Sequence, residues 1–120
     1  MAKKKTRAQL KKILWKHFSL FIRKRDKFTC VTCGRKGEGK GLHAGHYIVK
    51  GACGLDYYFS EKNTHAQCYN CNINLSGNTH KYRAFILRKY GEEVLNDIEM
   101  NYHKPCSDFP FLEKIAHYKE

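Results

Sequence analysis

The sequence lacks any run that approaches the roughly 18 apolar residues of a membrane-spanning helix. Its N-terminus also lacks the apolar segment and small-residue cleavage site of a signal peptide. No internal repeat or low-complexity linker divides the 120 residues, a length that fits one domain with a single small core. These absences predict a single-domain, cytoplasmic protein that is neither secreted nor inserted in a membrane.

Acidic residues are scarce. The chain has 11 Asp and Glu against 23 Lys and Arg, a net charge of +12. Met1 to Cys30 holds 11 of the basic residues beside a single acid, Asp26, whereas acids dominate after Glu92. Such an excess attracts a polyanion, because neutralised phosphates release condensed counterions, so DNA or RNA is the predicted partner. A solvated helix face or a membrane-surface helix would also account for an isolated basic tract.

The N-terminal third predicts one helix and one short strand. After a basic tail over residues 1–5, Thr6 and Gln9 have the form of a capping box, and apolar residues recur at helical spacing. We therefore expect a helix over residues 6–25, with Arg7 to Lys24 as its regular part. A short strand is predicted from Lys27 to Cys33.

The remaining elements are predicted from composition and periodicity. A strand is expected around Tyr47–Val49, after a Gly45 that would suit a bulge or a close backbone approach, and a loop then runs to about Asn63. Helices are expected from about Tyr82 to Tyr90, from Glu92 to Tyr102 and from about Phe109 to Tyr118. The first of these has Asn78 or Thr79 as a potential N-cap and Gly91 at its end.

Six cysteines in a reducing compartment favour metal binding over disulfides. Cys30-x-x-Cys33 and Cys68-x-x-Cys71, separated by 34 residues, supply four thiolates, the number that one tetrahedral Zn²⁺ accepts. Buried free thiols or a redox pair are the alternatives. The two remaining cysteines, Cys53 and Cys106, are expected to be small buried or half-buried residues.

Histidine and asparagine residues surround the cysteine pairs. The chain resembles the HNH, or ββα-metal, nucleases in the variant whose last histidine is asparagine. The residues that carry this resemblance are a histidine on a strand (His46), an asparagine in the following loop (Asn63) and an asparagine after the second cysteine pair (Asn72). More narrowly, "FIRKRDKFTCVTCG", "HAGHYIVKGA" and "NTHAQCYNCNINLSGNTHKYRAFILRKYG" are similar to the NinG (Rap) recombination nucleases of lambdoid phages. This resemblance covers roughly Phe18 to Gly91.

The resemblance implies an α+β fold and a nuclease. The fold would be a zinc-stabilised ββα-metal (HNH-like) core over residues 28–91, with an amphipathic N-terminal helix before it and C-terminal helices over residues 92–120. The function would be metal-dependent endonucleolytic cleavage of branched recombination intermediates such as Holliday junctions or D-loops. The host cytoplasm would be the site of action of such a bacteriophage protein.

The same resemblance implies roles for single residues. His46 would be the general base, since a neutral imidazole can take a proton from water near neutral pH, and Asn63 would fix its orientation through backbone hydrogen bonds. His43 and Asn72 would ligate the catalytic Mg²⁺ or Mn²⁺. The family has an aspartate where this chain has His43, which predicts a preference for softer divalent ions or a weakened activity.

Further residues are candidates for binding. His65 is a candidate metal ligand or phosphate contact, against the alternative of a hydrogen-bonded structural histidine. The predicted DNA contacts are basic residues close to these motifs: Arg35, Lys36, Lys50, Lys81 and Arg83. A homodimer through the apolar N-terminal or C-terminal helices would explain paired cuts across a junction, and recombination proteins would be further partners.

Other functions fit the same residues. A non-catalytic, zinc-stabilised DNA-binding module would bind with steep salt dependence and leave DNA intact. A generic HNH nuclease would nick or restrict ordinary duplex DNA. A zinc-ribbon-like protein interaction module is harder to reconcile with a net charge of +12.

Overall fold

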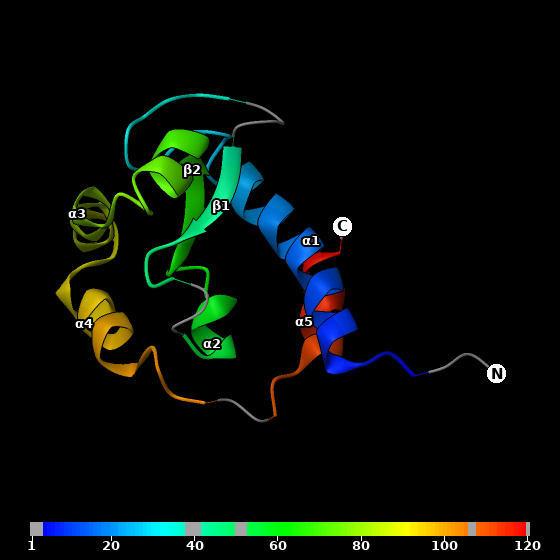
Figure 1. Ribbon diagram of the computed structural model, residues 1–120. Coiled ribbons are helices and arrows are strands. Elements are labelled where there is room, and N and C mark those ends of the chain that lie inside the picture. The colour runs from blue at the N-terminus through cyan, green and yellow to red at the C-terminus, as the bar shows by residue number, and fades with distance from the viewer. Residues whose placement is uncertain (1–3, 38–41, 50–52, 106–107, 120) are drawn as a thin grey trace.

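The structure is a computed structural model of the chain and describes residues 4–37, 42–49, 53–105 and 108–119. Over these residues the protein is a small α+β fold with an antiparallel pair of strands, β1 (Leu42–His46) and β2 (Thr64–Cys68). Helices α1 and α5 lie on one side of the strands and α3 and α4 on the other (Figure 1). None of the described helices has the length and apolar character needed to cross a membrane.

Helix α1 (Arg7–Arg25) begins with the predicted capping box. The Gln9 N–H donates to Thr6 Oγ1 at 3.2 Å, and the Thr6 N–H donates to Gln9 Oε1 at 2.8 Å. Leu14, Phe18 and Ile22 recur every four residues and are fully buried, so they form one stripe against the core. The predicted helix is therefore confirmed.

The segment after α1 is a turn, so the prediction of a strand from Lys27 to Cys33 is wrong. Lys27 and Phe28 have φ values of 54° and 51°, in the left-handed region that a strand cannot use. The chain then folds back, with the Cys30 N–H donating to the Arg35 carbonyl at 2.8 Å. This fold-back places Cys30 and Cys33 on one tight turn.

The two strands pair in a register that sets His43 opposite Gln67 and Gly45 opposite His65. Strand β1 ends at His46, earlier than the predicted strand around Tyr47–Val49. The Tyr47 N–H still donates to the Asn63 backbone carbonyl (2.8 Å), in the register of the strands, but the next N–H, of Ile48, donates to the Asn63 side chain (2.9 Å) and so leaves the backbone pairing. The segment expected to be a loop up to Asn63 contains a one-turn helix, α2 (Leu55–Tyr58).

The C-terminal half is helical. A π-helix, η1 (Asn70–Asn74), is followed by α3 (Thr79–Tyr90), α4 (Glu92–Asn101) and α5 (Phe111–Tyr118), close to the predicted ranges. Gly91, with a φ of 94°, separates α3 from α4 at the predicted position.

Two apolar clusters flank the strands. One joins α1 to α5 and to Tyr58 and Phe59, and the other joins α3 and α4 to Tyr47. The apolar stripe of α1 is therefore already covered within the chain, by residues that include Phe111 and Tyr118 of α5. The homodimer stays a prediction.

Candidate metal centre and adjoining cleft

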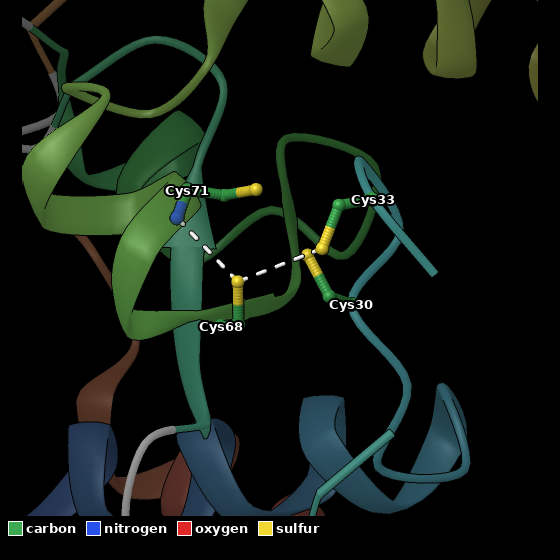
Figure 2. A group of neighbouring side chains, drawn as sticks. All are labelled: Cys30, Cys33, Cys68 and Cys71. Carbon is green, nitrogen blue, oxygen red and sulfur yellow. Dashed lines mark hydrogen bonds between the residues drawn. The ribbon is translucent and has the colours of Figure 1, made fainter. Parts of the chain in front are cut away.

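The four predicted cysteine ligands form one cluster. Their Sγ atoms lie within 4.8 Å of one another, although two come from the turn after α1 and two from β2 and η1. Figure 2 shows Cys30 and Cys33 facing Cys68 and Cys71 across a shared space. Sulfurs around a tetrahedral Zn²⁺, with Zn–S bonds of about 2.3 Å, lie roughly 3.8 Å apart, so the cluster fits zinc.

Hydrogen-bond donors surround the cluster and act differently on its two ends. Burial opposes ionisation of Cys30, yet hydrogen bonds from the Thr32 side chain and from neighbouring backbone groups lower its pKa to about 6. Burial and the hydrogen bonds that Cys33 shares with the other three cysteines raise the pKa of Cys33 to about 12. The Cys71 N–H lies 3.5 Å from Cys68 Sγ, and Asn78 Nδ2 lies 3.6 Å from Cys71 Sγ. Asn78, a predicted N-cap, occupies that position of α3 but donates to sulfur instead of capping the helix. These donors would stabilise the negative charge that a bound zinc shares with its ligands.

A cleft of about 710 Å³ lies beside the cysteine cluster. Its lining includes His43 and His46 of β1 and Asn72 of η1, three of the residues to which the family resemblance assigns catalytic roles. The lining also includes Trp15 and Arg23 of α1. Residues from three distant parts of the sequence thus meet at one concave surface.

His43 and Asn72 are in direct contact. The Asn72 Nδ2 atom lies 3.0 Å from His43 Nδ1, and both side chains are half-buried. Tyr69 meets the His43 ring edge-on, with ring centroids 5.8 Å apart. The two predicted ligands of a catalytic cation therefore converge, with the amide nitrogen of Asn72 toward the imidazole.

His46 is held from two sides. Its Nε2 lies 2.7 Å from the Tyr58 carbonyl oxygen, and its ring is stacked against Trp15 at a centroid distance of 5.3 Å. Because a carbonyl can only accept, Nε2 carries the proton and the lone pair of the neutral ring belongs to Nδ1. The ring is 8% exposed and belongs to the lining of the cleft.

Asn63 makes backbone hydrogen bonds of the predicted kind. Besides accepting from Ile48, its side chain donates to the Tyr57 carbonyl at 3.0 Å and to the Ile48 carbonyl at 3.3 Å. These bonds tie the segment after β1 to α2, whose Tyr58 carbonyl holds His46. Asn63 is fully buried and acts through the backbone rather than in the cleft.

His65, a candidate metal ligand or phosphate contact, lies in the core and is not part of the lining of the cleft. Its ring is fully buried, with Nδ1 3.1 Å from the Tyr82 hydroxyl and Nε2 2.7 Å from the Tyr90 hydroxyl. Burial, with smaller contributions from Arg25 and Lys89, lowers its pKa to about 2. These are the contacts of a hydrogen-bonded structural histidine, the alternative role for this residue.

The predicted DNA contacts differ in their surroundings. Arg35 and Lys36 are exposed and line a second hollow of about 380 Å³, which also includes Tyr69. Lys81 is exposed on α3, and Arg83 is paired with Glu99, at 2.8 Å from Nε to Oε2. Lys50 lies outside the described residues, as does Cys106.

Two residues of this region had no assigned role in the sequence analysis. Trp15 is the single tryptophan, and its position among the helical apolar residues suggested only packing. Gln67 is fully buried in β2, and nothing in its local sequence distinguishes it from a core residue. Both act through contacts with segments that are remote in the chain.

Comparison with known proteins places the chain in a family. The model of the family described as bacteriophage lambda NinG protein matches residues 1–118. Protein ninG of Escherichia phage lambda is 36% identical over 85 residues, covering 70% of this chain and 41% of the relative. Protein ninG of Salmonella phage P22 is 34% identical over the same length. This chain thus spans about two fifths of the length of these curated relatives. No solved structure matches it. The chain belongs to the NinG family of bacteriophage proteins.

Proposed function

We propose that the protein is a metal-dependent DNA endonuclease of the HNH type that acts on branched recombination intermediates. The observation that carries this proposal is the convergence of His43, His46 and Asn72 on one cleft beside the cysteine cluster. A general base and ligands for a divalent cation, side by side, are the parts that hydrolysis of a phosphodiester needs.

His46 would take the proton of the attacking water. The hydrogen bond from Nε2 to the Tyr58 carbonyl directs the lone pair to Nδ1, and the stacked Trp15 ring limits rotation of the imidazole. Asn63 supports this arrangement because it holds the backbone of Tyr57, the neighbour of Tyr58. A base with a set tautomer and orientation is ready for proton transfer without reorganisation.

His43 and Asn72 would hold the catalytic cation. When bound, a divalent ion would neutralise charge on the phosphate and the leaving oxygen. An imidazole nitrogen with an amide oxygen forms a mixed donor set, which suits Mn²⁺ and other transition metals better than Mg²⁺. Rotating the Asn72 amide by half a turn would bring its oxygen, in place of Nδ2, next to His43 Nδ1.

The residues around the cleft suit DNA. Arg23 lies in the cleft wall, and Arg35 and Lys36 line the hollow beside Tyr69. Tyr69, which precedes η1 and lines the second hollow, is 51% exposed, and Ile73 of η1, which lines the cleft, is 49% exposed. Exposed aromatic and apolar side chains can stack on unpaired bases, which branch points offer and continuous duplex does not.

One observation favours a second candidate, a zinc-stabilised DNA-binding module without catalysis. The Asn72 amide faces His43 Nδ1 with its nitrogen, so an N–H donor occupies the lone pair that a cation would need. With that contact in place, the protein would bind DNA and leave it intact. An HNH nuclease of ordinary duplex would instead cleave without preference for a branch.

Cleavage of a labelled four-way junction and a matched linear duplex, with Mg²⁺ or Mn²⁺, tests the proposal. His46→Ala should cut roughly 100-fold or more slowly while retaining zinc and DNA binding, because a general base contributes on that scale. His46→Gln is a second variant, which leaves a smaller cavity beside Trp15 than His46→Ala does. His80→Ala, on the exposed start of α3 and outside the cleft lining, is the matched control.

The outcomes separate the candidates. Junction cleavage that is lost in both His46 variants and kept in the control would support the nuclease. Junction binding without cleavage under either ion would favour the binding module. Equal cleavage of junction and linear duplex would favour the generic HNH nuclease.

A further inference from the structure

Gln67 is buried in β2, and within the described part of the chain only the nitrogen end of its side-chain amide has hydrogen-bond partners. Its Nε2 donates to the Gly77 carbonyl at 2.8 Å and lies 3.2 Å from Thr32 Oγ1. Because a carbonyl only accepts, this bond sets which end of the amide is nitrogen. The other end, Oε1, is buried and has no hydrogen-bond partner among the described residues. A buried acceptor of this kind lowers the stability of the fold unless a donor reaches it.

The unpartnered oxygen points at Gly45, across the strand pair. A Cβ added at Gly45 would lie 2.1 Å from Gln67 Oε1 and 2.9 Å from Asn72 Oδ1. Both oxygens therefore approach the same bare backbone of β1, where any larger residue would displace them. This is the close approach that Gly45 was expected to allow.

In its observed orientation the Asn72 amide turns its oxygen, a hydrogen-bond acceptor, toward the acceptor oxygen of Gln67. Its nitrogen, a donor, faces His43. Its Oδ1 shares the Gly45 face with Gln67 Oε1, while its Nδ2 is bonded to His43 Nδ1. Half a turn about the Cβ–Cγ bond exchanges the two ends. The N–H group would then turn to Gln67, and the oxygen would join His43 Nδ1 as a second electron-pair donor.

We propose that Gln67 is a positioning residue for the cation site. Its Oε1 accepts a hydrogen bond from the Asn72 amide N–H, and the Asn72 oxygen then faces a divalent cation beside His43. The inference rests on the proposed function, because the cation is the one that the nuclease reaction would use. Gln67 does not touch the cation. It stabilises the one orientation of Asn72 that can bind it, and the bond to Gly77 keeps Gln67 itself from turning.

Binding of Mn²⁺ to the zinc-loaded protein tests this role without any need for activity. The electron paramagnetic resonance signal of free Mn²⁺ measures how much of the ion is bound. Gln67→Met removes the acceptor at similar volume and should weaken Mn²⁺ binding about tenfold or more, the usual effect of removing a partner that orients a metal ligand. Zinc content and melting temperature are measured in parallel. Gln67→Glu retains an oxygen at this position and should bind Mn²⁺ more tightly than Gln67→Met.

A second background separates positioning from a structural effect. In Asn72→Asp both ends of the side chain are oxygens, so no orientation has to be selected. In that background Gln67→Met should weaken Mn²⁺ binding by less than twofold. The same tenfold loss in both backgrounds would overturn the inference, as would wild-type affinity in Gln67→Met or equal affinities for Gln67→Met and Gln67→Glu. Those results would leave the proposed nuclease in place. Absence of Mn²⁺ binding by the wild type would instead remove the cation site, and with it the inference and the metal-dependent mechanism.

Discussion

Acidification should destabilise this protein through His65. Burial lowers the pKa of His65 to about 2, whereas an unfolded histidine titrates near 6.5. Below pH 6.5 the unfolded chain therefore binds one more proton than the folded chain at this residue. The contribution of neutral His65 to stability is complete above pH 6.5 and is lost progressively as the pH falls toward the folded pKa.

The size of the effect follows from linkage. Between pH 7.5 and pH 5.5 the protonation of an unfolded histidine lowers the free energy of unfolding by about 1.4 kcal/mol, while the folded ring stays neutral. Urea unfolding at these two pH values, followed by Trp15 fluorescence, measures this change. His65→Gln cannot titrate, so its free energy of unfolding should fall by about 1.4 kcal/mol less than that of the wild type.

Comparing the wild type with His65→Gln cancels most other contributions to the pH dependence of stability. The other histidines and the cysteine cluster are present in both proteins, and zinc content is determined at each pH. An equal pH dependence in wild type and His65→Gln would refute the reasoning, because it would mean that His65 takes up a proton as readily in the folded state as in the unfolded state.

Two further predictions concern the metal centre and DNA binding. Cys68→Ser should abolish zinc binding and lower the melting temperature, because folding of the middle of the chain is linked to the metal, whereas Cys53→Ser should keep its zinc; unchanged zinc in Cys68→Ser would count against the four-cysteine site. Arg35→Gln should reduce the salt dependence of DNA binding by about one released counterion, and Arg83→Gln should change it less, because Glu99 already pairs with Arg83. A reduction of the slope by about one in both variants would show that the ion pair opens when DNA binds, and an unchanged slope in Arg35→Gln would remove Arg35 from the DNA contacts.

Local patterns predicted the features that depend on neighbours in the chain. The capping box of Thr6 and Gln9, the helical periodicity and the stop at Gly91 involve residues within a few positions of one another, and each is present. The spacing of Cys30 and Cys33, and of Cys68 and Cys71, likewise places two sulfurs on a single turn. Joining the two pairs required only one further assumption, that a tetrahedral ion takes four ligands.

Long-range contacts decided the features that the patterns missed. β2 is buried on both faces and so lacks the alternation that identifies a strand. The chain from Lys27 to Cys33 looked extended, but its left-handed residues and the hydrogen bond to Arg35 turn it back. The Asn63 side chain takes the Ile48 N–H in place of a backbone partner, so pairing of the first strand stops close to His46.

The sequence by itself determined the long helices, the pairing of the four cysteines that cluster and the family of the protein, because these depend on residue type and short spacing. Only the tertiary structure decided that His43, His46 and Asn72 share a cleft while His65 is enclosed by two tyrosines. The physical reason is that strand pairing and the packing of α1 set which way each side chain faces, and those interactions join residues far apart in the chain.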